Sequence, residues 1–227
     1  MGEPGKPVER EWLCRHPVEV AWRLIGCALT LERDGVIVGG RIVEAEAYAG
    51  PDDPASHASR LAVAKEAMAA APGSVYTYLS YGIHRMMNIV AHEPGQSGGV
   101  LLRALVPTVG LDAMRARRGV EAVERLARGP GSLGQAMGIQ LNDLGTDLLG
   151  PNGFCLRHGE PEYPVFAGPR IGISKNVDAP WRFFEHPNSF VSAHRKGASV
   201  DETDLWRLIP STPEETAAFG YPQEKTW

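Results

Sequence analysis

RIVEAEAY occupies residues 41–48, and a loop of sequence AGPDDPASH follows at residues 49–57. Because side chains alternate along a strand, this stretch would place Glu44, Glu46 and Tyr48 on one face and small alanines on the other. One interpretation is an edge strand with solvated charges. The other is the wall of a cleft, in which one glutamate acts as a base and the aromatic ring stacks on a ligand. Both interpretations require a strand, and both stay open at this point.

Strand and helix signals are interspersed on both sides of this stretch, without the repeated strand–helix–strand order of a parallel sheet. We therefore expect one α+β domain over residues 1–227, built on a strongly curved, mainly antiparallel β-sheet flanked by helices. The polar ends, at about 1–8 and 210–227, are expected to be loosely ordered tails. Apolar periodicity and composition predict helices at 18–31, 61–71, 111–127 and 133–139, and strands at 36–38, 41–45, 75–79, 87–91, 154–157, 170–173 and 190–191.

The composition excludes several classes of protein. Of the 227 residues, 43% are hydrophobic and 22% are charged, as in ordinary soluble globular chains. No apolar run approaches the roughly 20 residues of a membrane span, and the polar, proline-bearing N-terminus is not typical of a secretory signal. Three scattered cysteines make no disulfide framework. We expect a cytoplasmic protein without membrane contact.

The net charge of −4 argues at first against a nucleic-acid partner, which favours a basic surface. The charge is unevenly distributed, however, because residues 1–59 carry −4, residues 60–128 carry +4 and residues 129–227 carry −4. The basic residues of the middle part include the run Arg115, Arg117 and Arg118. They form either a solvated helix face or a local strip that contacts phosphates.

Four of the six tyrosines, Tyr48, Tyr76, Tyr78 and Tyr81, fall within 34 residues of one another. Aromatic platforms with cationic surroundings are used by proteins to hold unstacked bases. The alternative is that these rings are ordinary core or interface residues. Phosphate-cradling and dinucleotide motifs are absent from the sequence, and neither the cysteines nor the seven histidines show metal-ligand spacing. The sequence therefore predicts no cofactor and no metal.

Several blocks of the sequence, in order and with their spacing, resemble the signature of the alkyladenine (3-methyladenine) DNA glycosylase family. The similarity extends from about residue 8 to residue 194 and is far more specific than any single motif. The blocks are RIVEAEAYAGPDDPASH at 41–57, YTYLSYGIH at 76–84, MNIV at 87–90, LLRAL with its preceding Val at 100–105, GPGSL at 129–133, PRIGI at 169–173 and WRF at 181–183.

The resemblance implies a monofunctional glycosylase that flips a damaged purine out of duplex DNA and hydrolyses its N-glycosidic bond in base excision repair. By position, Glu46 resembles the general base that activates water, and Arg103 resembles its partner in positioning that water. The resemblance implies roles at the base for five further residues: Tyr48, His57 and Tyr78 as walls of the pocket, Asn88 as the side chain that discriminates against a guanine amino group, and Tyr81 as the wedge that fills the gap in the base stack.

The implied chemistry needs one carboxylate rather than two. Most glycoside hydrolases pair two carboxylates because a poor leaving group must be protonated, whereas an N3- or N7-alkylated purine is already cationic. Glu44 is therefore not expected to be a second catalytic acid. The expected partner is double-stranded DNA with damaged purines, bound by a monomer near the bacterial nucleoid. The expected substrates are 3-methyladenine and 7-methylguanine, with hypoxanthine as an open question because it is neutral and leaves poorly.

One segment departs from the family pattern. Residues 60–71 read RLAVAKEAMAAA, where the family usually carries an Arg/Thr/Arg/Asn-rich segment that ends in Met-Phe. The change motivates one alternative, a DNA lesion-binding protein with weak or no catalysis, against which the retained Glu46 and Arg103 argue. A second alternative is a small-molecule nucleoside hydrolase, which would not require the Tyr81 wedge.

Overall fold

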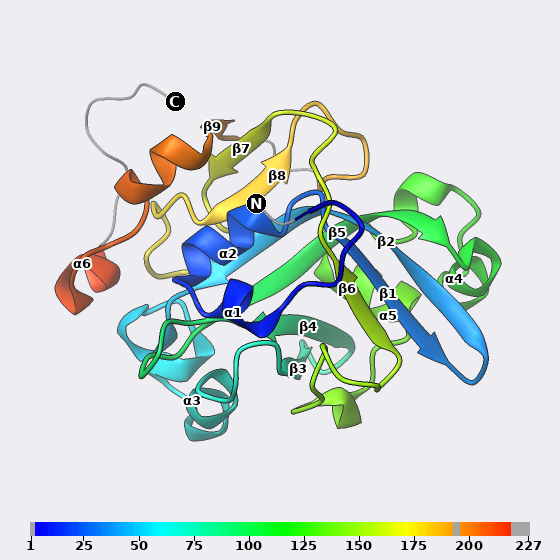
Figure 1. Ribbon diagram of the computed structural model, residues 1–227, viewed down its shortest axis with the longest axis horizontal. Helices are drawn as coiled ribbons and strands as arrows, with labels where there is room; N and C mark the ends of the chain where they lie inside the picture. Colours follow the sequence, from blue (N-terminus) through cyan, green and yellow to red (C-terminus); the bar gives the residue numbers. More distant parts are fainter. Residues whose placement is uncertain (1–2, 193–195, 219–227) are drawn as a thin grey trace.

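The strand β2 (Val36–Tyr48) lies inside the sheet and not at its edge. In the computed structural model, which describes residues 3–192 and 196–218, β2 pairs antiparallel with β5 (Gly99–Val109) on one side and with β8 (Arg182–Glu185) on the other (Figure 1). Its carboxylates Glu44 and Glu46 are completely buried. The edge-strand interpretation of this stretch is therefore wrong, because β8, a strand much later in the chain, pairs with the side of β2 that would otherwise be the edge.

The sheet continues on both sides of β2 in the order β3-β4-β5-β2-β8-β7-β9, and β1 and β6 extend it next to the first half of β2. Every pairing between these strands is antiparallel. The remaining strands are β1 (Ala28–Arg33), β3 (Val75–Ser80), β4 (His84–Val90), β6 (Phe154–Arg157), β7 (Val165–Gly168) and β9 (Ala198–Ser199). The predicted α+β class with an antiparallel sheet flanked by helices is confirmed.

Helices surround this sheet rather than alternate with its strands (Figure 1). Helix α2 packs on β2 and β5, while α5 packs on β4 and β5. The α-helices are α1 (Arg10–Leu13), α2 (Pro17–Arg23), α3 (Ala62–Met68), α4 (Leu111–Arg118), α5 (Pro130–Met137) and α6 (Pro213–Ala218). Short 3-10 helices are η1 (Gly50–Asp52), η2 (His57–Ser59), η3 (Val123–Arg125), η4 (Leu141–Asp143) and η5 (Glu202–Arg207).

The long helix predicted at 18–31 is a short helix followed by a strand. Helix α2 ends at Arg23, and the chain turns at Gly26 before β1 begins at Ala28. Gly26 has a φ of +96°, and a Cβ atom there would stand 2.3 Å from the backbone carbon of Glu160. Only glycine fits this position, so the apolar periodicity could not continue as a helix.

The two glycines that were expected to separate two strands lie within one continuous strand. A Cβ on Gly39 would stand 2.3 Å from the carbonyl oxygen of Leu29, and one on Gly40 would stand 2.0 Å from that of Val106. The neighbouring strands β1 and β5 therefore approach β2 closely from both sides, which explains the small residues there. Register shifts between β2 and β5 mark bulges, which bend a strand and increase its twist.

In the C-terminal third, the strands lie elsewhere than predicted, except for β6 at Phe154–Arg157. Residues 170–173 and 190–191 are not strands; β7 and β8 lie instead at Val165–Gly168 and Arg182–Glu185. The predicted helix at 111–127 ends at Arg118, where Gly119 caps it.

Alternation along the strands divides the sheet into two faces with different functions. One face carries apolar side chains that form the main hydrophobic core with α2, α4 and α5: Ala45, Ala47, Met87, Ile89, Val100 and Leu102. The other face carries polar and aromatic side chains at the intervening positions: Glu44, Glu46, Tyr48, Tyr76, Tyr78, Asn88 and Arg103. The same strands thus build the core with one set of side chains and a candidate site with the other.

The first residues that the structure describes are tied to this body, whereas residues 1–2 of the predicted N-terminal tail lie outside the described residues. The backbone N–H groups of Gly5 and Val8 donate to the carbonyls of His158 and Leu156, next to β6. Near the other end, α6 covers residues 213–218, and residues 219–227 lie outside the described residues. Within the ranges described, no helix combines the length and apolar character needed to cross a membrane.

Candidate active site

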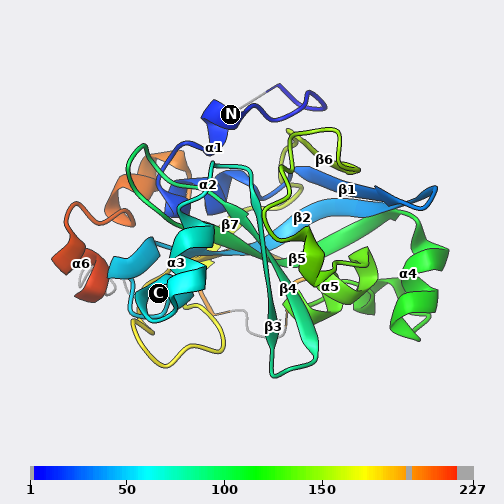
Figure 2. The ribbon, with the colours of Figure 1, turned by 90° about the horizontal axis from the view of Figure 1, so that it is seen from below.

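A cavity of about 460 Å³ opens on the polar face of the sheet. Its walls come from β2 to β5, from the loop around His57 and from the loop that follows β7. The β3–β4 hairpin and the loop after β7 project from the same side of the molecule (Figure 2). Six of the seven residues singled out from the sequence line this cavity: Tyr48, His57, Tyr78, Tyr81, Asn88 and Arg103.

The seventh residue, Glu46, lies directly behind the cavity wall and has 0% of its surface exposed. Its Oε1 accepts a hydrogen bond from the backbone N–H of Ile171 at 2.7 Å and lies 3.2 Å from Nη1 of Arg103. Its Oε2 accepts from the hydroxyl of Tyr48 at 3.0 Å. All three partners line the cavity. The carboxylate is therefore held in one orientation by groups that themselves face the ligand space.

Arg103 lies between two buried carboxylates. Its Nε donates to Oε1 of Glu44 at 3.1 Å, while its Nη1 faces Glu46. Burial lowers the pKa of the guanidinium, but the charges of Glu46 and Glu44 raise it further, so that the net pKa lies above the usual value. Arg103 is therefore cationic at any working pH, as expected for a group that orients a carboxylate and a water.

Glu44 is engaged on every side and cannot act as an acid. It accepts from Nη1 of Arg182 at 3.1 Å and from the backbone and side chain of Ser192 at 2.9 and 2.7 Å, in addition to Arg103. Burial raises the pKa of this carboxyl, but the charges of Arg103 and Arg182 and the hydrogen bonds from Ser192 hold it below its usual range. An ionised carboxylate has no proton to donate, which agrees with the expectation that the site works with one carboxylate.

Three aromatic side chains form one wall of the cavity. The rings of His57 and Tyr78 meet edge to face with centroids 4.4 Å apart, and Tyr76 lies 5.5 Å from Tyr78. Nδ1 of His57 is 3.3 Å from the hydroxyl of Tyr76. Burial and the charge of Arg60 lower the pKa of His57, so its ring is neutral at pH 7. Burial raises the pKa of Tyr76 to about 12, so this phenol keeps its proton.

Asn88 forms part of the cavity floor, at the position paired with Tyr76 in the β3–β4 ladder. Its Nδ2 donates to the carbonyl oxygen of Tyr76 at 3.1 Å, which fixes the amide in place. The side chain is buried. A fixed amide at the floor of a cavity can select among ligands by shape and by hydrogen bonding.

Tyr81 differs from the other rings because it is 90% exposed. It occupies the turn of the β3–β4 hairpin with a φ of +51°, a backbone region that non-glycine residues rarely adopt. The ring stands at the cavity mouth on a hairpin that projects from the body of the molecule (Figure 2). Leu79 and Ile83 on the same hairpin are 43% and 69% exposed, so apolar side chains gather around Tyr81, and an exposed apolar patch is typical of a binding surface.

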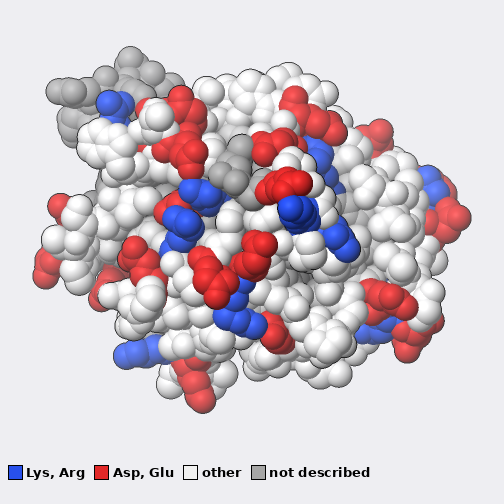
Figure 3. Space-filling view, in the orientation of Figure 1, with Lys and Arg blue, Asp and Glu red and all other residues white. Residues whose placement is uncertain are grey.

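The basic residues of the middle part serve two purposes. The run in α4 hydrogen-bonds to nearby parts of the chain and does not line the cavity: Arg115, Arg117 and Arg118. Arg60 and Arg103 of the middle part, in contrast, line the cavity, together with Lys175 from the C-terminal part of the chain. On the face seen in Figure 3, basic and acidic side chains are interspersed. The arginines of α4 therefore bond to their own surroundings, and the strip that contacts phosphates stays a prediction.

Several cavity residues were not found from the sequence. Met86 and Leu101 are in phase with Asn88 and Arg103, so strand alternation was a usable signal for them. The loop 171–175 forms a whole wall, but only its block PRIGI stood out, without a role. In residues 3–192 and 196–218, no three His, Cys, Asp or Glu side chains are grouped so that they could hold a metal ion.

The comparisons with known proteins agree with this geometry. The family described as methylpurine-DNA glycosylase (MPG) matches residues 11–189. A protein of Rhodopseudomonas palustris (strain HaA2), named "Putative 3-methyladenine DNA glycosylase", is 45% identical over 84% of this chain and 92% of its own length. Proteins with the same name from Chlorobaculum parvum and Nitrosococcus oceani are 42% and 40% identical, over 80% and 78% of this chain and 88% and 89% of their own lengths. The resemblance is confirmed, and the chain belongs to the methylpurine-DNA glycosylase family.

Proposed function

We propose that the protein flips an alkylated purine nucleotide out of duplex DNA into the 460 Å³ cavity and hydrolyses its N-glycosidic bond there. The observation that carries the proposal is the position of Glu46. Its carboxylate is oriented by Tyr48, Arg103 and Ile171 immediately behind an aromatic-lined cavity. Chemistry on a base requires that the base leaves the stack, at an unstacking cost of a few kcal/mol.

The reaction follows from the charge of the leaving group. In an N3- or N7-alkylated purine, the bond between C1′ and the base breaks with both electrons moving to the cationic base, which leaves neutral. The oxygen of a water bonds to C1′, and its proton passes to the carboxylate of Glu46. Glu46 is fully buried in the free protein. In this proposal the water therefore enters together with the nucleotide and binds beside Tyr48 and Arg103, within reach of the carboxylate. A positioned general base contributes about 10²–10⁴-fold to such a step.

The walls of the cavity suit an electron-poor purine. Tyr48 and Tyr78 offer π faces, on which a cationic base stacks with an additional cation–π component. The neutral ring of His57 offers a hydrogen bond to the base edge, and the buried amide of Asn88 disfavours the exocyclic amino group of guanine. These roles are the ones that the resemblance implies, and the cavity brings the four side chains together.

Tyr81 acts in this proposal as the wedge. An inserted ring replaces part of the stacking that is lost when the nucleotide leaves the duplex. The exposed ring at the cavity mouth supports this role. The protein then acts as a monomer on duplex DNA, with the hairpin inserted beside the lesion.

Product analysis tests the proposal. Methylated duplex DNA and inosine-containing duplex DNA are incubated side by side with the protein, and released bases are separated by chromatography. We expect release of 3-methyladenine and 7-methylguanine and no release of normal bases or uracil. Hypoxanthine release would require a proton donor to the neutral base, and the ionised Glu44 does not supply it. Absence of any released methylpurine would refute the proposal.

A lesion-binding protein without catalysis is the second candidate, because α3 departs from the family pattern. Val63 in this helix is 69% exposed and Leu61 before it is 50% exposed, where basic and polar residues are usual. A single-turnover assay separates the two candidates. Base release at a rate above that of the DNA alone excludes a pure binder, whereas tight lesion binding without release would favour it.

A further inference from the structure

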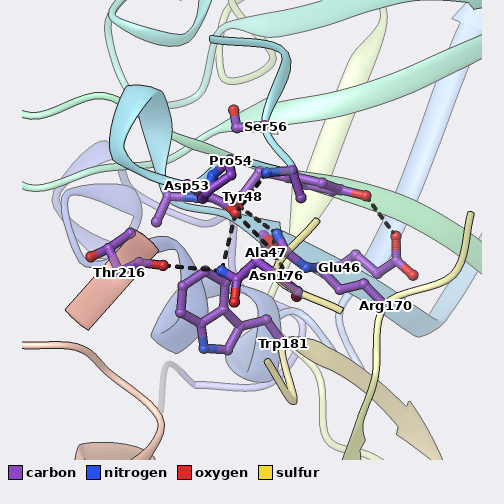
Figure 4. Close-up of polar contacts among 12 residues, drawn as sticks. Glu46, Ala47, Tyr48, Asp53, Pro54, Ser56, Arg170, Asn176, Trp181 and Thr216 are labelled. Atoms are coloured by element: carbon purple, nitrogen blue, oxygen red, sulfur yellow. Dashed lines mark hydrogen bonds and ion pairs between the residues drawn. The ribbon is translucent and has the colours of Figure 1, made fainter. Parts of the chain in front are cut away.

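Behind the cavity lies a buried ion pair that the chemistry described above does not use. Nη1 of Arg170 is 2.5 Å from Oδ2 of Asp53, and Nη2 is 3.0 Å from Oδ1. Both side chains are completely buried, and neither lines the cavity. Figure 4 shows the two residues among their polar contacts, drawn from segments 117 positions apart in the chain.

The guanidinium of Arg170 fixes the end of β2. Nη1 also donates to the carbonyl oxygen of Ala47 at 2.9 Å, next to the residue that lines the cavity. Its central carbon lies 4.8 Å from the ring centroid of Tyr48 and 4.9 Å from that of Trp181. The cation therefore holds the Tyr48 ring by contact with the ring and by a hydrogen bond to the preceding carbonyl.

The carboxylate of Asp53 fixes the loop that leads to His57. Oδ2 accepts from the backbone N–H of Ala49 at 3.4 Å, while Oδ1 accepts from that of Ala55 at 3.1 Å. Oδ1 also accepts from Nδ2 of Asn176 at 3.3 Å, which ties in the loop after β7. The loop residues Pro54 and Ala55 line the cavity directly. One carboxylate thus closes the loop through directional bonds that an apolar side chain could not make.

The residue that follows Arg170 connects the pair to the general base. Ile171 donates its backbone N–H to Oε1 of Glu46 at 2.7 Å, and residues 171–175 form a wall of the cavity. A shift of Arg170 would move this N–H together with the wall. Replacing a buried ion pair by apolar residues is often neutral or stabilising, so global stability alone gives little reason for a charge pair at this position.

We propose that Arg170 and Asp53 are positioning residues of the glycosylase site, which hold Tyr48, the His57 loop and the Ile171 N–H in the geometry that catalysis requires. The inference rests on the proposed function, because it takes Tyr48 and Glu46 as members of the base site. The inference assigns one positioning role to the ion pair at each of three segments: the end of β2, the loop that leads to His57 and the loop that begins at Ile171. In none of these roles does the pair contact the substrate.

Two conservative variants and a matched control test the inference. Arg170→Lys keeps the charge but loses the paired bonds and the planar stacking, and Asp53→Asn keeps the shape but loses the charge. The control pair is Arg33 and Asp143, which are 2.5 Å apart and mostly buried, and neither residue lines the cavity. Arg33→Lys and Asp143→Asn report what the loss of an ion pair does to this fold in general. Thermal stability is measured for all four variants.

The readouts are the single-turnover rate of methylpurine release and the affinity for duplex DNA that carries a tetrahydrofuran abasic analogue. We expect both Arg170→Lys and Asp53→Asn to lose about 10- to 100-fold in rate, since a displacement of about 1 Å has effects of that size. Affinity for the abasic duplex, which places no base in the cavity, should stay within about threefold. The control variants should keep the wild-type rate even where their stability falls equally.

A rate loss in the control variants equal to that at Arg170 and Asp53, at equal stability, would overturn the inference, and so would unchanged rates in the site variants. A crystal structure of Arg170→Lys gives a readout independent of activity. The distance between Oη of Tyr48 and Oε2 of Glu46 is 3.0 Å, and its persistence in that variant would also refute the positioning role. If the wild-type protein released no base, the proposed function would fail, and this structural comparison would still decide the inference.

Discussion

Tyr48 donates its hydroxyl hydrogen bond to Glu46, two residues earlier on the same strand, with 3.0 Å between Oη and Oε2. The pair joins a ring that faces the cavity to a carboxylate that has no exposed surface. Burial and the charge of Glu46 raise the pKa of Tyr48 well above its usual value, so the phenol stays protonated and the bond persists over the working pH range. One contact therefore orients both a wall of the proposed base pocket and the proposed general base.

Replacing Glu46 by Gln should abolish base release while leaving binding to damaged DNA within about tenfold of wild type. An amide still accepts hydrogen bonds from its neighbours but cannot take a proton from water. Single-turnover release from methylated duplex and equilibrium binding to the same duplex measure the two effects separately. Glu162→Gln, at an exposed carboxylate remote from the cavity, is the control. Joint loss of binding and release in Glu46→Gln would mean that Glu46 is structural.

Tyr81→Ala should reduce release from duplex DNA by about tenfold or more, since ring stacking on a base is worth about 1–3 kcal/mol. The stability of the fold should change by no more than about 0.5 kcal/mol, because the ring is exposed. Tyr163→Ala, at another exposed tyrosine outside the cavity lining, is the matched control. Unchanged turnover of duplex lesions in Tyr81→Ala would favour the nucleoside hydrolase alternative.

Asn88→Ala should relax the selection between adenine- and guanine-derived lesions. The amide is buried in the cavity floor, and its removal leaves room for an exocyclic amino group. We expect the ratio of 7-methylguanine to 3-methyladenine release to rise by about tenfold, the effect of roughly 1.4 kcal/mol of differential binding. Competition between the two lesions in one reaction measures the ratio directly. An unchanged ratio would remove Asn88 from the specificity determinants.

His16 predicts a pH dependence of stability that is independent of the site. Its Nδ1 accepts from the backbone N–H of Val18 at 3.3 Å and caps α2, and burial lowers the pKa of the ring to about 4. The unfolded chain, with a pKa of about 6.5, binds the proton first. This contribution to the free energy of unfolding is therefore complete above about pH 6.5 and is lost as the pH falls towards 4. The loss is at most about 3 kcal/mol, and the accessible part of the ring makes it smaller than this limit.

The variant His16→Asn checks this pH dependence, because Asn keeps the capping acceptor and does not titrate. Urea unfolding at pH 7 and at pH 4.5 should show a smaller difference for the variant than for wild type. Carboxylates that titrate in the same range contribute equally to both proteins and cancel in the comparison. Parallel pH profiles would show that His16 is not responsible.

Base release should persist in the presence of a strong chelator such as EDTA. The proposed chemistry needs only a carboxylate, a positioned water and a cationic leaving group. The rate of methylpurine release with and without chelator, after dialysis against it, measures the requirement. Recovery of activity only on addition of a divalent cation would contradict the mechanism.

The fold could be predicted where local signals decide the structure. The strand Phe154–Arg157 has the predicted bounds, because alternation and turn residues suffice there. Strand β8 was missed because its four residues include Arg182 and Glu185, both buried. Their partners, Glu44 and Arg41, lie 138 and 144 positions away in the sequence. The local sequence therefore does not predict that these charged side chains are buried in ion pairs.

The candidate site also has features that the local sequence predicts and features that depend on distant segments. Strand alternation was sufficient to group Glu44, Glu46 and Tyr48 on one face, and the structure brings the other implied residues to the same cavity. The burial of the glutamates and the role of Arg170 could not be predicted, because both depend on segments that meet only in the folded chain. The block PRIGI carried the resemblance but gave no physical reason for its arginine.

The hydrogen bond from Ile171 to Glu46 joins residues 125 positions apart. During synthesis, the hairpins of β1 to β5 are available for pairing well before Ile171 is made. A nascent chain can therefore hold much of the sheet, together with the Tyr81 hairpin, while its carboxylate still lacks a fixed orientation. Contacts between distant segments form late because of the cost of closing long loops. The proposed hydrolytic competence should thus appear last, so that each molecule gains the ability to release a base from DNA only when its folding is complete.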